Sequence, residues 1–202
     1  GVQTCALPIS RGDDAIIEYT QKFDSKYITL ANFVVTDTEI KNAYKMVDQD
    51  FLDAIRLAKV NVKEFHEKQK RNAWMMTKEK GAILGQTLRG LESVGIYVPG
   101  GTASYPSSVI MNAIPAKVAG VENLVMVTPP LKDGTVNPHI LVAADIAGVN
   151  KIYKMGGAQA IAGLAYGTEK ISKVDKIVGP GNIYVAMAKK SVFGSVAIDM
   201  IA

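Results

Sequence analysis

The chain has 202 residues, of which 48% are hydrophobic, and its 23 Lys and Arg against 19 Asp and Glu give a formal net charge of +4. This length and apolar content are enough for an ordinary globular core, which excludes a disordered chain. Basic and acidic residues alternate, so nothing indicates a nucleic-acid partner. No apolar run approaches the roughly 18 residues that span a bilayer, so a membrane protein is excluded as well.

The first ten residues, GVQTCALPIS, differ from the rest of the chain. They carry no charge, show no helical period and lack the basic start of a signal peptide. The decapeptide resembles a translated sequencing-adapter remnant, so we expect residues 1–10 to be a non-native tail; the alternative is a short natural tail. The single cysteine, Cys5, lies within it. One cysteine excludes an internal disulfide and a multi-cysteine metal site, and fits a reducing compartment such as the cytoplasm.

The segment 11–92 is predicted to be mostly helical. Its apolar residues recur at spacings of three and four, which places them on one face of a helix. Helices are expected over 13–23, from Glu39 after an N-cap at Thr36 or Thr38, and over 50–71. A stretch of β-branched and aromatic residues at 27–35 is predicted to be extended.

From residue 93 the pattern changes to short β-like runs, each followed by a Gly or Pro loop and a segment of helical period. The runs are 94–98, 123–128, 151–155 and 176–178. The helices are expected over 107–119, 138–147, 158–166 and 183–192. Alternating strands and helices predict an α/β fold with a parallel sheet and crossover helices on its faces.

The loops after the four runs contain VPGGTA, TPP, GGAQ and GPGN. In a parallel sheet they share the carboxyl edge, where ligands bind. Glycine lets backbone N–H groups approach a phosphate, and a helix N-terminus favours an anion. Neither GxGxxG nor GxxxxGK[ST] is present. Three glycine loops on one edge favour a nucleotide-like ligand; the alternative is that the glycines only make tight turns.

Three residues at this edge are candidate ligand contacts. Tyr97 ends the first run, where its ring can line a pocket or pack in the core. Gln159 and Asn182 are amides at predicted helix N-termini, able to donate and accept hydrogen bonds without adding charge. Their alternative role is helix capping, which asparagine performs well and glutamine poorly.

Residues for catalysis or metal binding are not evident. The two histidines, His66 and His139, are far apart, and neither belongs to an HExxH motif. No GxSxG nucleophile elbow occurs. The sequence therefore predicts a binding edge, and we assign no catalytic and no metal-ligating residue.

Several ordered segments together resemble the histidinol dehydrogenase family. They are RGDDAIIEYTQKFD (11–24), FHEKQ (65–69), VGIYVPGGTASYPSSVIMNAIPAKVAGV (94–121), TPP (128–130), GGAQAIAGLAYGTE (156–169), VDKIVGPGNIYVA (174–186) and IDMIA (198–202). The resemblance extends over essentially everything from Arg11 onward.

The resemblance implies an enzyme that oxidises L-histidinol to L-histidine in two NAD-dependent steps, at the end of histidine biosynthesis, as a zinc-containing homodimer in the cytoplasm. The family's NAD contacts fall on Tyr97, Gln159 and Asn182. Its dinucleotide domain is a diverged Rossmann unit, which agrees with the missing GxGxxG and is expected over 93–196.

By the same resemblance, the family's zinc ligands and its Glu-His catalytic pair lie beyond Ala202. We therefore expect an N-terminal fragment that does not turn over histidinol alone. Segment 11–92 would be the mostly helical part of an incomplete first domain, and 197–202 the start of the C-terminal half.

Two other functions stay open. One is a related NAD-dependent alcohol dehydrogenase, such as one acting on sulfopropanediol, because substrate choice depends on residues outside this chain. The other is a stand-alone nucleotide-binding or regulatory module.

Overall fold

Five parallel strands form the central sheet of the computed structural model, which describes residues 2–100 and 104–200 and, for 2–10, only the backbone. The spatial order is β5-β4-β3-β6-β7. The strands are β3 (Ser93–Tyr97), β4 (Asn123–Thr128), β5 (Lys151–Lys154), β6 (Lys176–Val178) and β7 (Ala197–Ile198). The predicted α/β class and all four predicted strands are confirmed, and β7 adds a short fifth.

The strand order is that of a doubly wound sheet. In chain order the five strands lie 3-2-1-4-5, so the direction of winding reverses between β3 and β6. These two strands pair directly, with Val94 opposite Lys176 and Ile96 opposite Val178. Loops from both halves of the sheet therefore diverge at the carboxyl ends of β3 and β6, which is where such folds bind their ligands.

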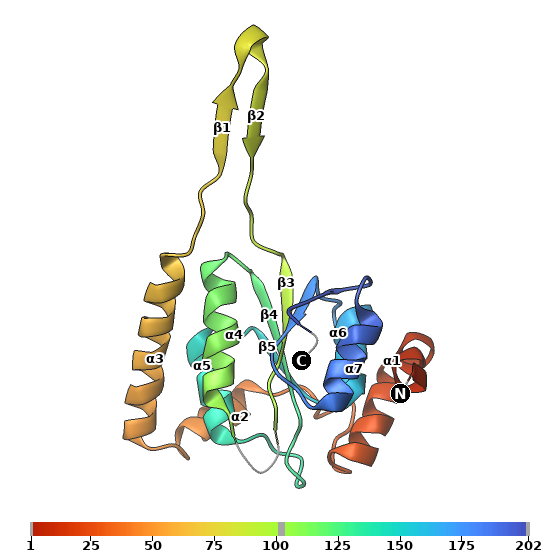
Figure 1. Ribbon diagram of the computed structural model, residues 1–202. Coiled ribbons are helices and arrows are strands. Elements are labelled where there is room, and N and C mark those ends of the chain that lie inside the picture. Colours follow the sequence, from red (N-terminus) through yellow and green to blue (C-terminus); the bar gives the residue numbers. More distant parts are fainter. Residues whose placement is uncertain (1, 101–103, 201–202) are drawn as a thin grey trace.

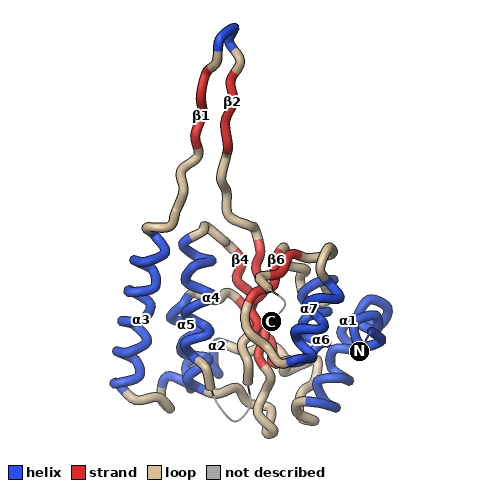
Figure 2. Tube along the Cα trace, viewed as in Figure 1, coloured by secondary structure: helices blue, strands red, loops and turns tan. Residues whose placement is uncertain are grey.

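Helices cover both faces of the sheet (Figures 1 and 2). On one face lie α2 (Asp37–Tyr44), α3 (Gln49–Glu67), α4 (Pro106–Val118) and α5 (Pro138–Ala147). On the other lie α1 (Val2–Phe23), α6 (Gly157–Tyr166) and α7 (Ile183–Val192). The four helices predicted after residue 93 are confirmed to within one residue at each end.

Alternating side chains of the strands divide the interior into two cores, because successive residues of a strand face opposite sides. Val94 and Ile96 of β3 belong to the core under α4 and α5, whereas Tyr97 belongs to the core under α6 and α7. Gly95 also faces α6, where a Cβ would lie 2.8 Å from a methyl group of Leu164. The glycine thus lets α6 pack closely on the sheet.

The first half of the chain departs from several predictions. Helix α1 includes residues 2–10, where no helical period is evident, and is interrupted at Gly12, whose φ is +53°. The predicted helix 13–23 is its second part. The side chain of Cys5 lies outside the described part of the chain. The predicted extended stretch 27–35 is mostly turns, with a single bridge from Val34 to β5.

Helices α2 and α3 begin with side-chain caps. Thr36 caps α2 in a capping box: its hydroxyl accepts from the Glu39 N–H, and the Glu39 carboxylate accepts from the Thr36 N–H. Of the two caps considered, Thr36 is therefore the one used. Helix α3 ends at Glu67 rather than at residue 71. None of the helices in the described ranges is both long and apolar enough to cross a membrane.

A β-hairpin follows α3 and was not predicted. Strand β1 (Trp74–Thr77) pairs antiparallel with β2 (Ile83–Gln86) across a short turn, and every residue of both strands is exposed. The hairpin projects away from the helices and the sheet (Figure 1). The prediction that 11–92 is mostly helical is wrong over this segment.

Removal of the hairpin is expected to leave the stability of the remaining fold almost unchanged. Trp74 pairs with Gln86, so the ends of the excised segment 74–86 are adjacent and an Asn-Gly turn can join Ala73 to Thr87. Because the excised side chains are exposed, the free energy of unfolding should change by less than about 1 kcal/mol. Urea unfolding followed by far-UV circular dichroism measures this; a loss above about 2 kcal/mol would show that the hairpin packs on the body.

Candidate functional site

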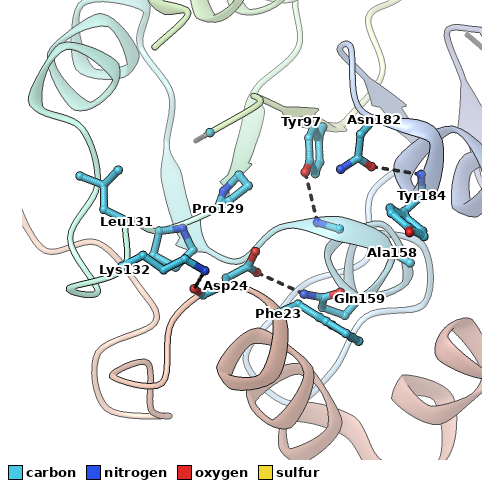
Figure 3. Close-up of a pocket in the computed structure, with 13 residues that line it drawn as sticks. Phe23, Asp24, Tyr97, Pro129, Leu131, Lys132, Ala158, Gln159, Asn182 and Tyr184 are labelled. Atoms are coloured by element: carbon cyan, nitrogen blue, oxygen red, sulfur yellow. Dashed lines mark hydrogen bonds between the residues drawn. The ribbon is translucent and has the colours of Figure 1, made fainter. Parts of the chain in front are cut away.

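A cavity of about 750 Å³ lies at the carboxyl edge of the sheet, beside the reversal between β3 and β6 (Figure 3). Its volume falls in the range of small-molecule sites. Segments distant in sequence line it. They are Phe23 and Asp24 at the end of α1, Tyr97 and Gly100 at the end of β3, residues 129–132 after β4, residues 157–159 of α6, and Asn182 and Tyr184 at α7. Tyr97, Gln159 and Asn182, the three predicted contacts, are therefore brought together.

Tyr97 is 3% exposed, and its ring belongs to the core under α6. Its hydroxyl oxygen accepts a hydrogen bond from the Gly157 N–H at 3.1 Å. Burial raises the pKa of Tyr97 to about 12, so the phenol stays protonated at neutral pH. The ring packs in the core, which is one of the two roles considered from the sequence, and Tyr97 is also one of the residues that line the cavity.

Gln159 lies in the first turn of α6 and is 2% exposed. Among the described hydrogen bonds, its side chain makes none to a backbone N–H at the start of α6. Instead its Nε2 donates to Asp24 Oδ2 at 3.3 Å. The amide is thus held by a carboxylate from another part of the chain, at the wall of the cavity.

Asn182 is the N-cap of α7. Its Oδ1 accepts from the N–H groups of Tyr184 and Val185, each at 3.1 Å. Capping, the alternative considered from the sequence, is therefore real for this oxygen. The Nδ2 group remains as the donor with which Asn182 can contact a ligand.

Asp24 and Lys132 also line the cavity, and sequence reasoning missed both as site residues. Asp24 Oδ2 accepts from the Gly156 N–H at 3.0 Å as well as from Gln159. Lys132 Nζ donates to the Asp24 carbonyl oxygen at 3.0 Å. Burial raises the pKa of Asp24, although the Gly156 N–H and Lys132 act in the opposite direction. The described lining of the cavity thus includes one carboxylate and one ammonium group.

Asp24 reaches this position because α1 packs on α6. Ile16 is fully buried, and its Cδ1 lies over Gly163, where a Cβ would be only 3.2 Å away. The Asp13 carboxylate accepts from the Thr168 hydroxyl beyond the end of α6. In the sequence, the position of Asp24 is marked only by the Phe23-Asp24 pair at the end of the TQKFD segment. Helical periodicity does not reveal which distant residues Asp24 contacts.

Backbone amides of two glycine loops already have acidic partners from the chain itself. Gly156 donates to Asp24, and Gly179 donates to Asp199 Oδ2 at 2.8 Å. These two N–H groups are therefore engaged within the chain, and the expectation that the glycine loops suit a phosphate stays a prediction for their other N–H groups. In the PGG loop, Gly101 lies outside the described residues.

Comparison of the chain with known proteins identifies its family. Residues 9–202 match the family model for histidinol dehydrogenase. The chain belongs to the histidinol dehydrogenase family. It is 66% identical over 191 residues to a histidinol dehydrogenase of Clostridium acetobutylicum and 58% identical over 192 residues to that of Geobacillus kaustophilus. These matches cover 95% of this chain, but only 44% and 45% of the relatives.

A solved histidinol dehydrogenase has the same fold. The crystal structure of the enzyme from Elizabethkingia anophelis matches with a TM-score of 0.94 and 40% identity, covering all of this chain and 46% of that one. The chain therefore spans less than half the length of the relatives it matches. The sulfopropanediol enzyme and the stand-alone module are not favoured by these matches.

The described part of this histidinol dehydrogenase family chain does not fit a zinc ion. Among residues 2–100 and 104–200, no three His, Cys, Asp or Glu side chains gather as a metal site. His66 pairs with Gln69, and His139 packs edge-on against Phe51. Both histidines therefore make contacts within the chain and do not gather with other metal-ligating side chains of the described residues.

Proposed function

We propose that the cavity binds NAD, and that the chain is the cofactor-binding part of a histidinol dehydrogenase that oxidises L-histidinol to L-histidine with two NAD. The observation that supports this is the meeting of Tyr97, Gln159 and Asn182, from three strand-helix units, at one cavity beside the strand-order reversal. The substrate is inferred from the name histidinol dehydrogenase, which the relatives carry. A homodimer with zinc in the whole protein, working in the cytoplasm, belongs to the same proposal.

NAD, when bound, would supply the hydride acceptor for the two oxidation steps. The residues that line the cavity bind and orient it. The Tyr97 hydroxyl, protonated at neutral pH, donates to a cofactor oxygen while Gly157 holds its own oxygen in place. The Asn182 amide donates from the same side of the cavity, beside Tyr97. Phe23 and Pro129 supply apolar surface against which a flat ring packs.

Loss of either amide should weaken NADH binding by at least tenfold. Asn182→Asp is the sharper variant, because aspartate also caps a helix but lacks the Nδ2 donor, so a folding defect is avoided. Gln159→Ala removes the second amide. Titration of NADH fluorescence, supported by saturation-transfer NMR for weak complexes, gives the affinities.

The matched control is Gln49→Ala, which removes an exposed amide whose partner is Asp53, away from the cavity. This variant should bind NADH as the parent chain does. Unchanged affinity in both Asn182→Asp and Gln159→Ala would show that the cofactor site has been misplaced.

A further inference from the structure

In a doubly wound dinucleotide fold, a carboxylate at the end of the second strand usually accepts hydrogen bonds from the ribose hydroxyls and repels a ribose that carries a phosphate. In this chain the second strand of the sheet is β4, which ends at Thr128 and is followed by Pro129-Pro130. The first acidic residue after it, Asp133, is exposed and bonds to Thr135 in its own turn. Within the described ranges, the usual position therefore holds no acid that lines the cavity.

Asp24 brings a carboxylate to this part of the cavity from outside the sheet. A Cβ on Gly156 would lie 2.5 Å from Pro129 Cγ and 3.2 Å from Asp24 Oδ1, so the carboxylate and the end of the β4 loop meet at the same glycine. Figure 3 shows Asp24 between Pro129 and Gln159, with Tyr97 across the cavity. A residue that precedes the sheet by some seventy positions, as counted from Asp24 to the start of β3 at Ser93, thus brings a carboxylate next to the end of the β4 loop.

The two carboxylate oxygens of Asp24 differ in their hydrogen bonds. Oδ2 is fixed by the Gly156 N–H and by Gln159 Nε2. Among the described residues none donates to Oδ1, which leaves this oxygen as an acceptor toward the cavity. A carboxylate held in this way accepts a hydroxyl well and, because it also occupies the N-terminus of α6, leaves no favourable place there for a second anion.

We propose that Asp24 is a specificity-determining residue: its Oδ1 accepts a hydroxyl of the cofactor ribose, and its charge rejects a ribose bearing a 2′-phosphate. The inference rests on the proposed function, that NAD binds this cavity. Of the described residues, Lys132 is the one cation that lines the cavity, and its Nζ donates to the Asp24 carbonyl. The carboxylate, rather than this ammonium group, is therefore expected to decide the preference.

The test compares NADH with NADPH by fluorescence titration on the parent chain and two isosteric variants, Asp24→Asn and Asp133→Asn. The parent should prefer NADH by at least tenfold. Asp24→Asn should bind NADH several-fold more weakly and reduce the preference to less than about threefold. Asp133→Asn, which removes the same charge from the neighbouring exposed loop, should behave as the parent does.

The outcomes distinguish the proposed function from the role of Asp24. No binding of either nucleotide to the parent would overturn the proposed function and the inference with it. Binding of NADH with equal or tighter binding of NADPH would leave the proposed function standing and overturn the role of Asp24. An undiminished preference for NADH over NADPH in Asp24→Asn would likewise leave the proposed function standing and overturn the role of Asp24. Competition of NADH with 5′-AMP and 2′-AMP on the parent chain tests the preference without any variant, and equal competition would also contradict it.

Discussion

Replacing Gly179 with alanine is expected to destabilise the folded chain by about 3 kcal/mol or more. Gly179 begins the GPGN loop after β6, with a φ of +107°, a region that side chains with a Cβ rarely adopt. A Cβ there would also lie 2.2 Å from the Tyr97 carbonyl oxygen. Neither the Gly179 backbone nor the Tyr97 backbone can move away easily, because β3 and β6 are paired in the sheet. Urea unfolding gives the change in free energy.

Gly120 provides the matched control, because it has a similar φ of +87° but open space where its Cβ would be. Gly120→Ala should therefore cost only the conformational strain, about 1 kcal/mol. The difference between the two variants isolates the close approach to Tyr97. Equal losses would mean that this approach contributes nothing. The close approach of Gly179 to Tyr97 also brings the loop that carries Asn182 next to the end of β3.

The sheet and its crossover helices could be predicted because each element carries its own local signals. Helix α5 begins at Pro138 after the cap Asn137 and ends before Gly148, whose φ is +80°. Helix α7 begins after the Asn182 cap. The strands are short apolar runs bounded by such loops, and burial on both faces matches that pattern. Local chemistry and tertiary structure agree in this half of the chain.

The hairpin could not be predicted in the same way, because no buried face imposes a period on it. Trp74, Met75 and Met76 follow one another, and all three are exposed. Two apolar residues of the second strand, Ile83 and Leu84, are also adjacent and exposed. Without alternation between a covered and a solvated side, neither the strand period nor the helix period appears in the sequence.

The residues of the candidate site also fall into those that local sequence patterns predict and those that they do not. Tyr97 ends a strand of the sheet, and Gln159 and Asn182 follow strands, so the α/β pattern alone places them on one edge. Asp24 and Lys132 join them only through tertiary contacts: α1 must first pack on α6, and the β4 loop must then bring Lys132 to the Asp24 carbonyl. Periodicity locates a residue on its own helix, but it does not say which distant helix lies beside it.

The second large effect is expected from Lys189→Met. Lys189 is a helical residue of α7 that is 3% exposed, and its Nζ donates to the Gly179 carbonyl oxygen at 2.9 Å and forms an ion pair with Asp199. Methionine preserves most of the volume but leaves the partly buried Asp199 carboxylate without its counter-charge. Loss of one partner of a buried pair costs about 3 kcal/mol. Lys190→Met, at the exposed neighbouring position, should cost less than about 0.5 kcal/mol.

The pH dependence of this loss distinguishes the ion pair from lost packing. Burial acts to raise the pKa of Asp199, but hydrogen bonds from Lys189, Gly179 and Met200 outweigh it and hold the pKa below its usual value of 3.8. The stabilisation is therefore complete above that value and is lost as the pH falls through the lower pKa of the folded chain. The difference between parent and Lys189→Met should be largest near neutral pH and shrink in acid. A difference in unfolding free energy that stays constant as the pH falls from neutral through the folded-state pKa of Asp199 would instead assign the loss to packing of the Lys189 stem.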